Sequence, residues 1–240
     1  MIDGKQVVVI AASSGIGLEV ARQAALRGAL VTLTGRNRDR LKAAADSIGT
    51  SVTTAAFDAT DRTQLSNFVQ QLGRIDHLVS CIGDTEWGAF LELDEHRARE
   101  VVELKFWAQL SIVREVHRSM VKGGSITLTA GTSVDRGLLP YKAAFSVLGN
   151  TMLEVLVRGL SAEMAPVRVN LVEPTVTNTP LFSQMTEEHR RELFARFGSS
   201  LPIGRIPEPH EVARSYIHLM ESDLVNGDRI RPDGGPMFGV

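Results

Sequence analysis

The sequence predicts an α/β fold of one domain, residues 1–240, built on a doubly wound parallel sheet. Short apolar runs alternate with helical patterns along the whole chain, which is typical of repeated βαβ units. No internal repeat, low-complexity segment or Pro-rich linker divides the chain. In addition, a loop of small residues, Ser13–Gly17, joins the first predicted strand to the first predicted helix, as in Rossmann-like folds.

The predicted strands are continuous apolar runs rather than alternating ones, because strands of a parallel sheet are buried on both faces. They cover Val7–Ile10, Leu30–Leu33, Val52–Phe57, His77–Ile82, Ser125–Leu128, Val167–Val172 and Asp228–Arg231.

The predicted helices have apolar residues at spacings of three and four. We expect Gly28 to end the first helix, Asp61 to cap the third, and Gly123 with Gly124 to break the long fourth region. The helices cover Gly17–Arg27, Asn37–Ile48, Asp61–Leu72, Leu93–Lys122, Lys142–Met164, Glu187–Phe197 and Pro209–Met220.

Composition argues against several classes of function. The formal net charge of −2 offers no basic surface for nucleic acid. No apolar run approaches the ~20 residues needed to span a bilayer, and the first residues lack the apolar region of a signal peptide. Cys81 is the single cysteine, so no intrachain disulfide can form. We expect a cytoplasmic protein with neither a membrane nor a nucleic-acid partner.

Residues after the first two strands point to a dinucleotide. The Ser13–Gly17 loop would present backbone N–H groups to a pyrophosphate at a helix N-terminus. Arg36 follows Gly17 by nineteen residues, near the position where a carboxylate would read a ribose 2′-OH. An arginine there offers donors to a 2′-phosphate instead, so NADP(H) is favoured over NAD(H), with Asn37 and Arg38 beside it. The alternative is that these arginines are solvated loop charges.

The ends of the third and fourth strands complete the expected cofactor site. Asp58, followed by Ala59, could accept a hydrogen bond from an adenine amine. The small residues around Cys81–Gly83 would let a ribose approach the backbone, and Cys81 is interpreted as a small buried side chain rather than a nucleophile. The histidines lie on separate elements without ligand spacing, so we expect no metal site.

Five stretches, taken in order, resemble motifs of the short-chain dehydrogenase/reductase family over essentially all of the chain. They are residues 11–17, which resemble its Gly-x-x-x-Gly-x-Gly loop, and residues 76–83, 167–174, 202–205 and 233–235. The resemblance implies a nicotinamide-dependent oxidoreductase, and it implies that Thr177 and Thr179 contact the nicotinamide carboxamide and the phosphates. The expected cofactor-binding residues are therefore Ala12, Ser13, Ser14, Gly15, Ile16, Gly17, Arg36, Asn37, Arg38, Asp58, Ala59, Cys81, Ile82, Gly83, Thr177 and Thr179.

The resemblance also implies a substrate lid over about residues 179–201 and a homodimer or homotetramer formed through Leu93–Lys122 and Lys142–Met164. Apolar side chains in and near the lid suggest an apolar substrate, although such a stripe is often plain packing. They are Trp87, Phe90, Leu181, Phe182, Met185, Leu193, Phe194 and Phe197.

The sequence departs from the family at the catalytic positions. Members of the family use a Tyr-x-x-x-Lys pair on the helix after the fifth strand. Alignment by the body of that helix puts Ser146 at the tyrosine position and Asn150 at the lysine position. The family's serine falls near Ala130 or Ser133, and its helix asparagine falls on Lys105.

Two further points concern the loops. An alternative register places Tyr141 at the tyrosine position, but it demands five extra residues within the helix, which is more than one turn. Ala11 replaces the first glycine of the phosphate loop, and we expect it to keep a negative φ.

Three residues stay as candidate proton donors: Ser133, Tyr141 and Lys105. An ammonium in a water-poor pocket would have a lowered pKa and could act as an acid or an electrostatic stabiliser. The alternative is that Lys105 faces solvent or an interface.

Three hypotheses for function follow. The first is an NADP(H)-dependent oxidoreductase with a non-standard proton donor, acting on an apolar carbonyl or imine. The second is a non-redox enzyme, a cyclase or isomerase, that keeps the nucleotide as a scaffold. The third is a catalytically silent nucleotide-binding protein.

Overall fold

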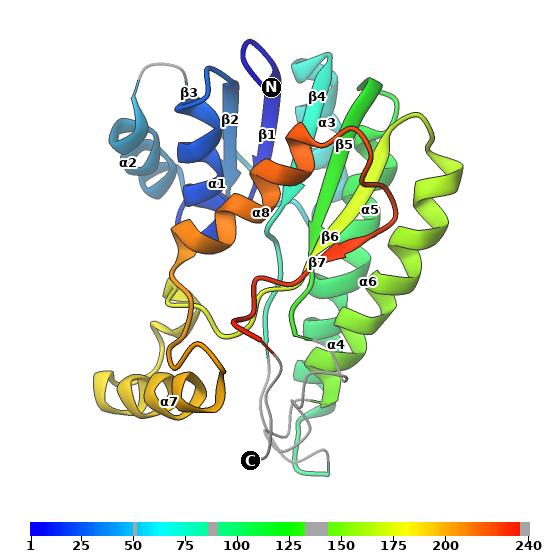
Figure 1. Cartoon of the computed structure of the whole chain (residues 1–240). Helices are drawn as coiled ribbons and strands as arrows, with labels where there is room; N and C mark the ends of the chain where they lie inside the picture. The colour runs from blue at the N-terminus through cyan, green and yellow to red at the C-terminus, as the bar shows by residue number, and fades with distance from the viewer. Residues whose placement is uncertain (50–51, 86–90, 133–143, 236–240) are drawn as a thin grey trace.

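The seven strands of the computed structural model form one parallel sheet in the order β3-β2-β1-β4-β5-β6-β7 (Figure 1). The model describes residues 1–49, 52–85, 91–132 and 144–235. The strands are β1 (Gln6–Ile10), β2 (Leu30–Gly35), β3 (Val52–Ala56), β4 (Ile75–Ser80), β5 (Met120–Thr129), β6 (Arg168–Val172) and β7 (Arg229–Ile230). This order reverses between β1 and β4, which confirms the doubly wound α/β fold predicted from the sequence.

Helices cover both faces of the sheet (Figure 1). They are α1 (Gly15–Ala25), α2 (Arg38–Ile48), α3 (Arg62–Leu72), α4 (Glu95–Val102), α5 (Ala108–Val116), α6 (Ala144–Glu163), α7 (Glu187–Ser200) and α8 (Pro209–Glu221). One core cluster packs α1, α2 and α8 on the sheet, and a second packs α3, α5 and α6 on the opposite face.

Side chains cap several helices where the sequence predicted a start. Asp61 accepts hydrogen bonds from the backbone N–H groups of Thr63 and Gln64 at the N-terminus of α3, as expected. Asn37 caps α2 by accepting from the backbone N–H of Arg40. These local signals were readable because a cap needs only neighbours in the sequence.

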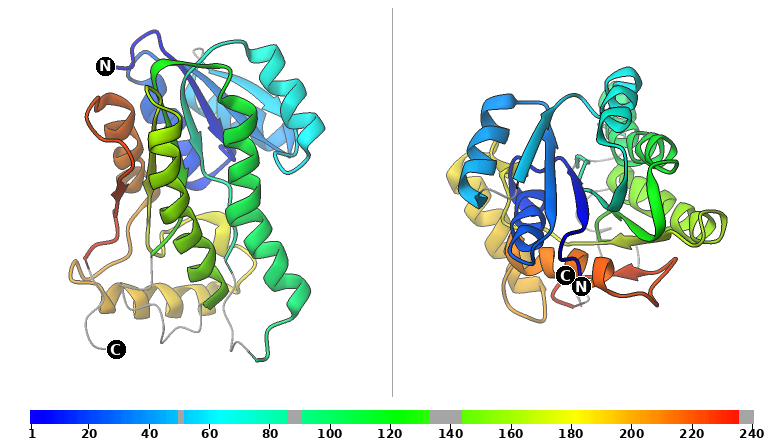
Figure 2. Two further views of the ribbon diagram at one scale, coloured as in Figure 1. Left: turned by 90° about the vertical axis from the view of Figure 1, so that its right-hand side faces the viewer. Right: turned by 90° about the horizontal axis from the view of Figure 1, so that it is seen from above.

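The prediction for the fourth helical region was partly wrong. α4, the π-helical turn η1 (Glu103–Trp107) and α5 form one continuous rod beside α6 (Figure 2), but the rod ends at Val116. Gly123 and Gly124 do not break a helix; they lie inside β5. A side chain on Gly124 would meet the carbonyl oxygen of Asp76 at 2.4 Å, and Gly123 has φ +80°, so the glycine pair permits an irregular pairing of β5 with β4.

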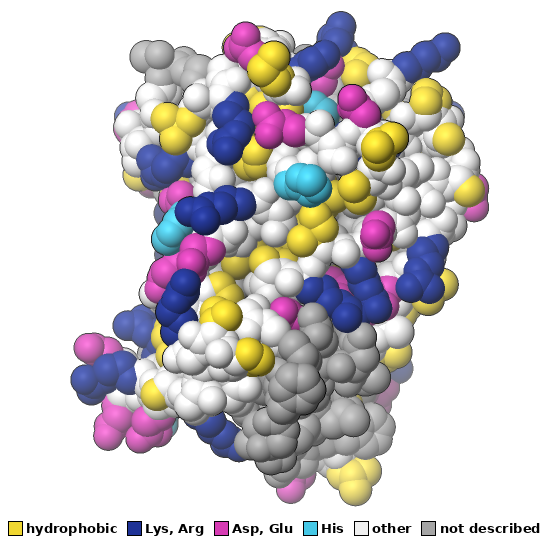
Figure 3. Space-filling view, in the orientation of Figure 1, with side chains coloured by type: hydrophobic (Ala, Val, Ile, Leu, Met, Phe, Trp, Pro, Cys, Tyr) yellow, Lys and Arg dark blue, Asp and Glu magenta, His cyan; other side chains and the backbone are white. Residues whose placement is uncertain are grey.

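Charged side chains are interspersed on the face seen in Figure 3, and basic residues do not gather there in one large patch. Among the described residues, no helix is long and apolar enough to cross a membrane.

Candidate functional site

A cleft of about 430 Å³ lies at the carboxyl end of the sheet. It is lined by the loops that follow β1, β2, β4, β5 and β6, by the inner face of α6 and by the 3₁₀ turn η4 (Pro180–Phe182). Ligands of open parallel sheets bind in this place, because loops diverge where the strand order reverses. Loops far apart in the sequence therefore meet around one space.

The loop after β1 forms one end of the cleft. Residues 13–17 all line it, as the sequence predicted, whereas Ala12 is fully buried in the core behind the loop. The first N–H groups of any α-helix lack an intrahelical partner, and Ser14, the N-cap of α1, makes no side-chain hydrogen bond that would cap them. A side chain on Gly17 would meet the carbonyl oxygen of Ala11 at 2.5 Å. The loop thus places backbone N–H groups without a side-chain cap at the cleft.

The expectation of a negative φ for Ala11 was wrong. Ala11 has φ +61°, the one positive φ of a non-glycine residue in the described chain. The tight turn before α1 forces this conformation, and the Cβ group makes it a strained one.

The loop after β2 brings two arginines to the cleft. Arg36 lines it, as predicted, and so does Arg40 from the first turn of α2. Neither guanidinium makes a hydrogen bond or an ion pair with a described residue. Arg38 is exposed and does not line the cleft, and the Asn37 side chain serves as the helix cap.

The ends of β3 and β4 differ in their relation to the cleft. Asp58 accepts from the backbone and side chain of Thr60 and, like Ala59, does not line the cleft. Cys81, Ile82 and Gly83 do line it. Burial raises the pKa of the Cys81 thiol to about 12, so the thiolate is disfavoured, in agreement with its interpretation as a small apolar side chain.

Lys105 lies at the centre of the π-helical turn and lines the cleft from the side of α6. The wide turn is held by Gln109, whose side chain donates to the carbonyl oxygens of Lys105 (2.9 Å) and Thr129 (2.8 Å). Gly149 of α6 permits the close approach of the lysine, because a Cβ there would meet Lys105 Cβ at 3.0 Å. The lysine is therefore packed between two helices rather than free on a surface.

The Lys105 side chain is only 8% exposed, which excludes the alternative that it faces solvent. Its Nζ lies 4.0 Å from the point where a Cβ of Gly83 would stand, at the wall of the cleft. Burial lowers the pKa of its ammonium to about 8, and the negative charge of Asp84 opposes part of that change.

The two positions aligned with the family's tyrosine and lysine also line the cleft. Ser146 is buried, and its hydroxyl lies 3.0 Å from that of Thr85. Asn150 is buried and donates to the carbonyl oxygen of Thr132, while its Oδ1 has no partner among the described residues. Uncharged side chains thus line the cleft at the two positions that the sequence alignment predicts for the family's pair.

The remaining predicted site residues divide into two groups. Thr177 and Thr179 line the cleft after β6, and Thr179 packs over Gly15 of the first loop. Ser133 and Tyr141, the other candidate proton donors, lie outside the described residues, as do Trp87 and Phe90.

The predicted lid is partly a core of its own. Leu181 and Phe182 line the cleft. Phe182 and Phe197 belong to a small apolar cluster with Leu193 and Phe194 packed against it, and the rings of Phe182 and Phe194 meet edge to face at 5.4 Å. Four side chains of the predicted apolar stripe therefore pack in a small core, which also contains Val147 of α6 and Val176.

Sequence reasoning missed several lining residues, among them Arg40, Asp84, Thr85 and Thr132. Arg40 could have been found, since it lies in the first turn of the predicted helix that follows Arg36. Asp84 and Thr85 follow β4, and Thr132 follows β5; the sequence pattern does not give the last residue of a strand exactly, so these three were not predicted. Among the described residues, no group of His, Cys, Asp and Glu could hold a metal ion.

The fold and the cleft define a Rossmann-like α/β protein with a ligand-sized cleft at the carboxyl end of its sheet, and comparison with known proteins gives the family. A family model described as Enoyl-(Acyl carrier protein) reductase matches residues 10–236. The galactitol 2-dehydrogenase (L-tagatose-forming) of Cereibacter sphaeroides is 31% identical, over 98% of this chain and 95% of that protein. The chain belongs to the short-chain dehydrogenase/reductase family.

Other relatives agree. The short-chain dehydrogenase/reductase ATR9 of Stachybotrys chlorohalonatus is 29% identical over 98% of this chain and 97% of that protein. Among solved structures, BdcA in complex with NADPH superposes with a TM-score of 0.86 at 26% identity, covering 99% of this chain and 97% of that chain. A short-chain dehydrogenase/reductase from Serratia marcescens gives a TM-score of 0.88 at 25% identity, covering 98% of both chains.

Proposed function

We propose that the protein is an NADP(H)-dependent oxidoreductase that acts on an apolar carbonyl or imine with a proton donor other than the family's tyrosine. The observation that carries the proposal is the pair of unpaired guanidiniums, Arg36 and Arg40, in the cleft after β2. Two cations with no counter-charge among the described residues, beside a helix N-terminus without a side-chain cap, suit an anionic ligand. The crystal structure of BdcA, a similar protein, is a complex with NADPH.

The residues of the cleft fit a dinucleotide in several places. The uncapped N-terminus of α1 offers donors and a favourable dipole to the pyrophosphate. Gly17 keeps the loop free of a side chain that would collide with its own backbone. Arg36 and Arg40 would hold the 2′-phosphate of the adenosine ribose, while Gly83 would adjoin the nicotinamide half. Bound there, the nucleotide would supply the hydride.

Lys105 is the donor that this chain offers for the developing oxyanion. Its ammonium is buried and lines the cleft, and its lowered pKa of about 8 lies close to neutral pH. A fixed positive charge in a water-poor site stabilises a negative oxygen far better than it would in water. Ser133 and Tyr141 stay as further candidates for proton delivery.

The nucleotide assignment is tested by titrating the protein with NADPH and with NADH and following nucleotide fluorescence. Loss of one charge-assisted hydrogen bond to a phosphate costs about 1.5–3 kcal/mol, so Arg36→Ala should weaken NADPH binding about 10- to 100-fold and leave NADH binding unchanged. Arg62→Ala, at an exposed position of α3, removes the same charge away from the cleft and serves as the control. Equal weakening of both nucleotides, or no NADPH binding at micromolar concentration, would overturn the assignment.

One observation favours a second candidate, a non-redox enzyme or a silent nucleotide-binding protein on the same scaffold. Ser146 is a poor acid near neutral pH, and Asn150 carries no charge, so the aligned catalytic pair is missing. A panel of aldehydes, ketones and imines with NADPH distinguishes the two. NADPH that binds tightly but is never oxidised would favour the second candidate.

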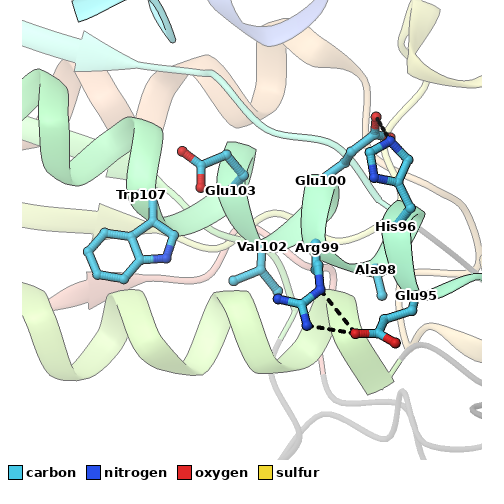
Figure 4. A pocket seen from close by; sticks show the side chains of 8 residues that line it. All are labelled: Glu95, His96, Ala98, Arg99, Glu100, Val102, Glu103 and Trp107. Atoms are coloured by element: carbon cyan, nitrogen blue, oxygen red, sulfur yellow. Dashed lines mark hydrogen bonds and ion pairs between the residues drawn. The ribbon is translucent and has the colours of Figure 1, made fainter.

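We further propose a homodimer or homotetramer formed through α4, η1 and α6, in the cytoplasm. A groove of about 700 Å³ runs along the outer face of α4 and η1, where Trp107 is 46% exposed (Figure 4). On neighbouring α6, Leu148 and Val155 are also exposed. Large apolar side chains on adjacent helices suit a subunit interface. Trp107→Glu should shift the molar mass by light scattering to that of the monomer, and an unchanged mass would reject this face.

A further inference from the structure

Two buried polar atoms of residues that line the cleft lack a hydrogen-bond partner among the described residues: the Oδ1 of Asn150 and the Oγ1 of Thr175. Lys105 lines the same cleft, and its ammonium makes no hydrogen bond with a described residue. All three residues are more than nine-tenths buried. Buried polar groups are almost always paired in folded proteins, so unpartnered groups around one space indicate a ligand that supplies the missing partners.

The lysine is the reactive member of this group. It is held in place along its whole length, with Gly149 against its Cβ and Cδ and Gly83 near its end. Glycines on both sides leave its amine open toward the cleft instead of covered by side chains. The carboxylate of Asp84, whose charge acts on the lysine, is paired with Arg97 at 2.5 Å, and no direct ion pair joins it to Lys105.

Two hydroxyl groups that line the same cleft can transfer protons. The Oγ atoms of Thr85 and Ser146 lie 3.0 Å apart, and either can be the donor. Such a pair can pass a proton without building up charge, because each oxygen donates one hydrogen as it accepts another.

We propose that Lys105 is a nucleophilic amine that condenses with an aldehyde or ketone in the cleft to form a reversible imine. This activity goes beyond the proposed oxidoreductase and needs no nucleotide. The substrate class follows from the chemistry of an unpartnered, desolvated primary amine, whose neutral form attacks electrophilic carbonyl carbon.

The step balances without an oxidant or reductant. The nitrogen lone pair forms a bond to the carbonyl carbon, and the C=O π electrons move to oxygen. The oxygen takes up a proton and the nitrogen gives one up, which produces a carbinolamine. The hydroxyl takes up a proton and leaves as water while the nitrogen lone pair forms C=N, and the nitrogen then gives up its remaining proton. Amine plus carbonyl gives imine plus water, and the Thr85–Ser146 pair relays the protons.

The test traps the imine chemically in the full-length protein. The protein is incubated with benzaldehyde or hexanal at pH 8 without nucleotide, sodium borohydride is added to reduce any imine to a stable secondary amine, and labelled peptides are quantified by mass spectrometry. We expect Lys105 to be labelled at least about ten-fold more than exposed Lys42, since a larger share of its amine is neutral. Labelling in urea should remove this preference.

Two kinds of variant test the Lys105 amine itself and the packing that positions it. Lys105→Arg keeps the charge but offers no nucleophile, so the preferred adduct should vanish. Gly149→Ala should reduce labelling by pushing Lys105 out of position, whereas Gly159→Ala on the same helix, where a Cβ meets nothing within 4 Å, should not. Labelling of Lys105 no greater than that of Lys42, in protein shown to be folded by its thermal transition, would overturn the proposal. That result would leave NADPH binding untouched, so the two proposals fail separately.

Discussion

Replacing Lys105 by methionine should make the protein more stable at neutral pH. Burial lowers the pKa of this ammonium from 10.5 to about 8. That difference corresponds to about 3 kcal/mol of unfavourable free energy when the buried group is charged. Methionine has a similar length, no charge and a flexible chain that fills the same space. The free energy of unfolding at pH 7 should therefore rise by up to about 3 kcal/mol.

The sign of the effect can be checked through its pH dependence. Because the pKa is lower in the folded state, the unfolded chain binds more protons between pH 8 and pH 10.5, and the wild-type protein gains stability across that window. Lys105→Met has no such group and gains nothing there. The advantage of the variant should be full below pH 8 and shrink as the pH rises toward 10.5.

The assay is urea unfolding at pH 7 and at pH 10, with the midpoint and slope measured for each protein. Lys42→Met is the control, because Lys42 is exposed, pairs with Asp46 and does not touch the cleft. A variant of Lys105 that is no more stable than wild type at pH 7 would refute the reasoning. So would a gain of the same size at both pH values, which would mean that packing and not charge causes it.

Three further results are expected. Ala11→Gly should raise the free energy of unfolding by about 1 kcal/mol in urea, since φ +61° strains alanine and suits glycine; a loss would mean that the loop relaxes around the methyl group. Burial raises the pKa of Glu173 to about 7, so the folded state keeps this proton to a higher pH than the unfolded chain does, and the free energy of unfolding should fall as the pH rises from 4.5 to 7. In thermal melts, the melting temperature of Glu173→Gln should depend less on pH over this range. The triple variant Lys105→Asn, Ser146→Tyr and Asn150→Lys gives the cleft a general acid, so kcat/KM for carbonyl reduction should rise about 10²- to 10⁴-fold, and an unchanged value would show that proton delivery is not the deficit.

The sequence alone was enough for the fold class and for most elements. Continuous apolar runs give buried parallel strands, and the caps at Asn37 and Asp61 mark helix starts, because both signals depend only on neighbours along the chain. The sequence also predicted that residues 13–17 and Arg36 lie at the carboxyl end of the sheet, because each directly follows a strand along the chain.

Other features needed the assembled structure. Gly123 and Gly124 read as a helix break by sequence, but the carbonyl of Asp76 on the neighbouring strand decides that they belong to β5. Likewise, no local pattern says whether Lys105 faces solvent or the cleft.

The sequence by itself determined the parallel α/β scaffold and which residues follow its first two strands: a loop of small residues, then an arginine. It also shows that no Tyr-x-x-x-Lys pair is present in the favoured alignment. The tertiary structure alone decided what meets in the cleft. Gly149 on α6 and Gln109 on α5 turn Lys105 inward, and Arg40 joins Arg36. The physical reason is that burial, and with it the lowered pKa of the lysine, depends on contacts between segments that are distant in sequence.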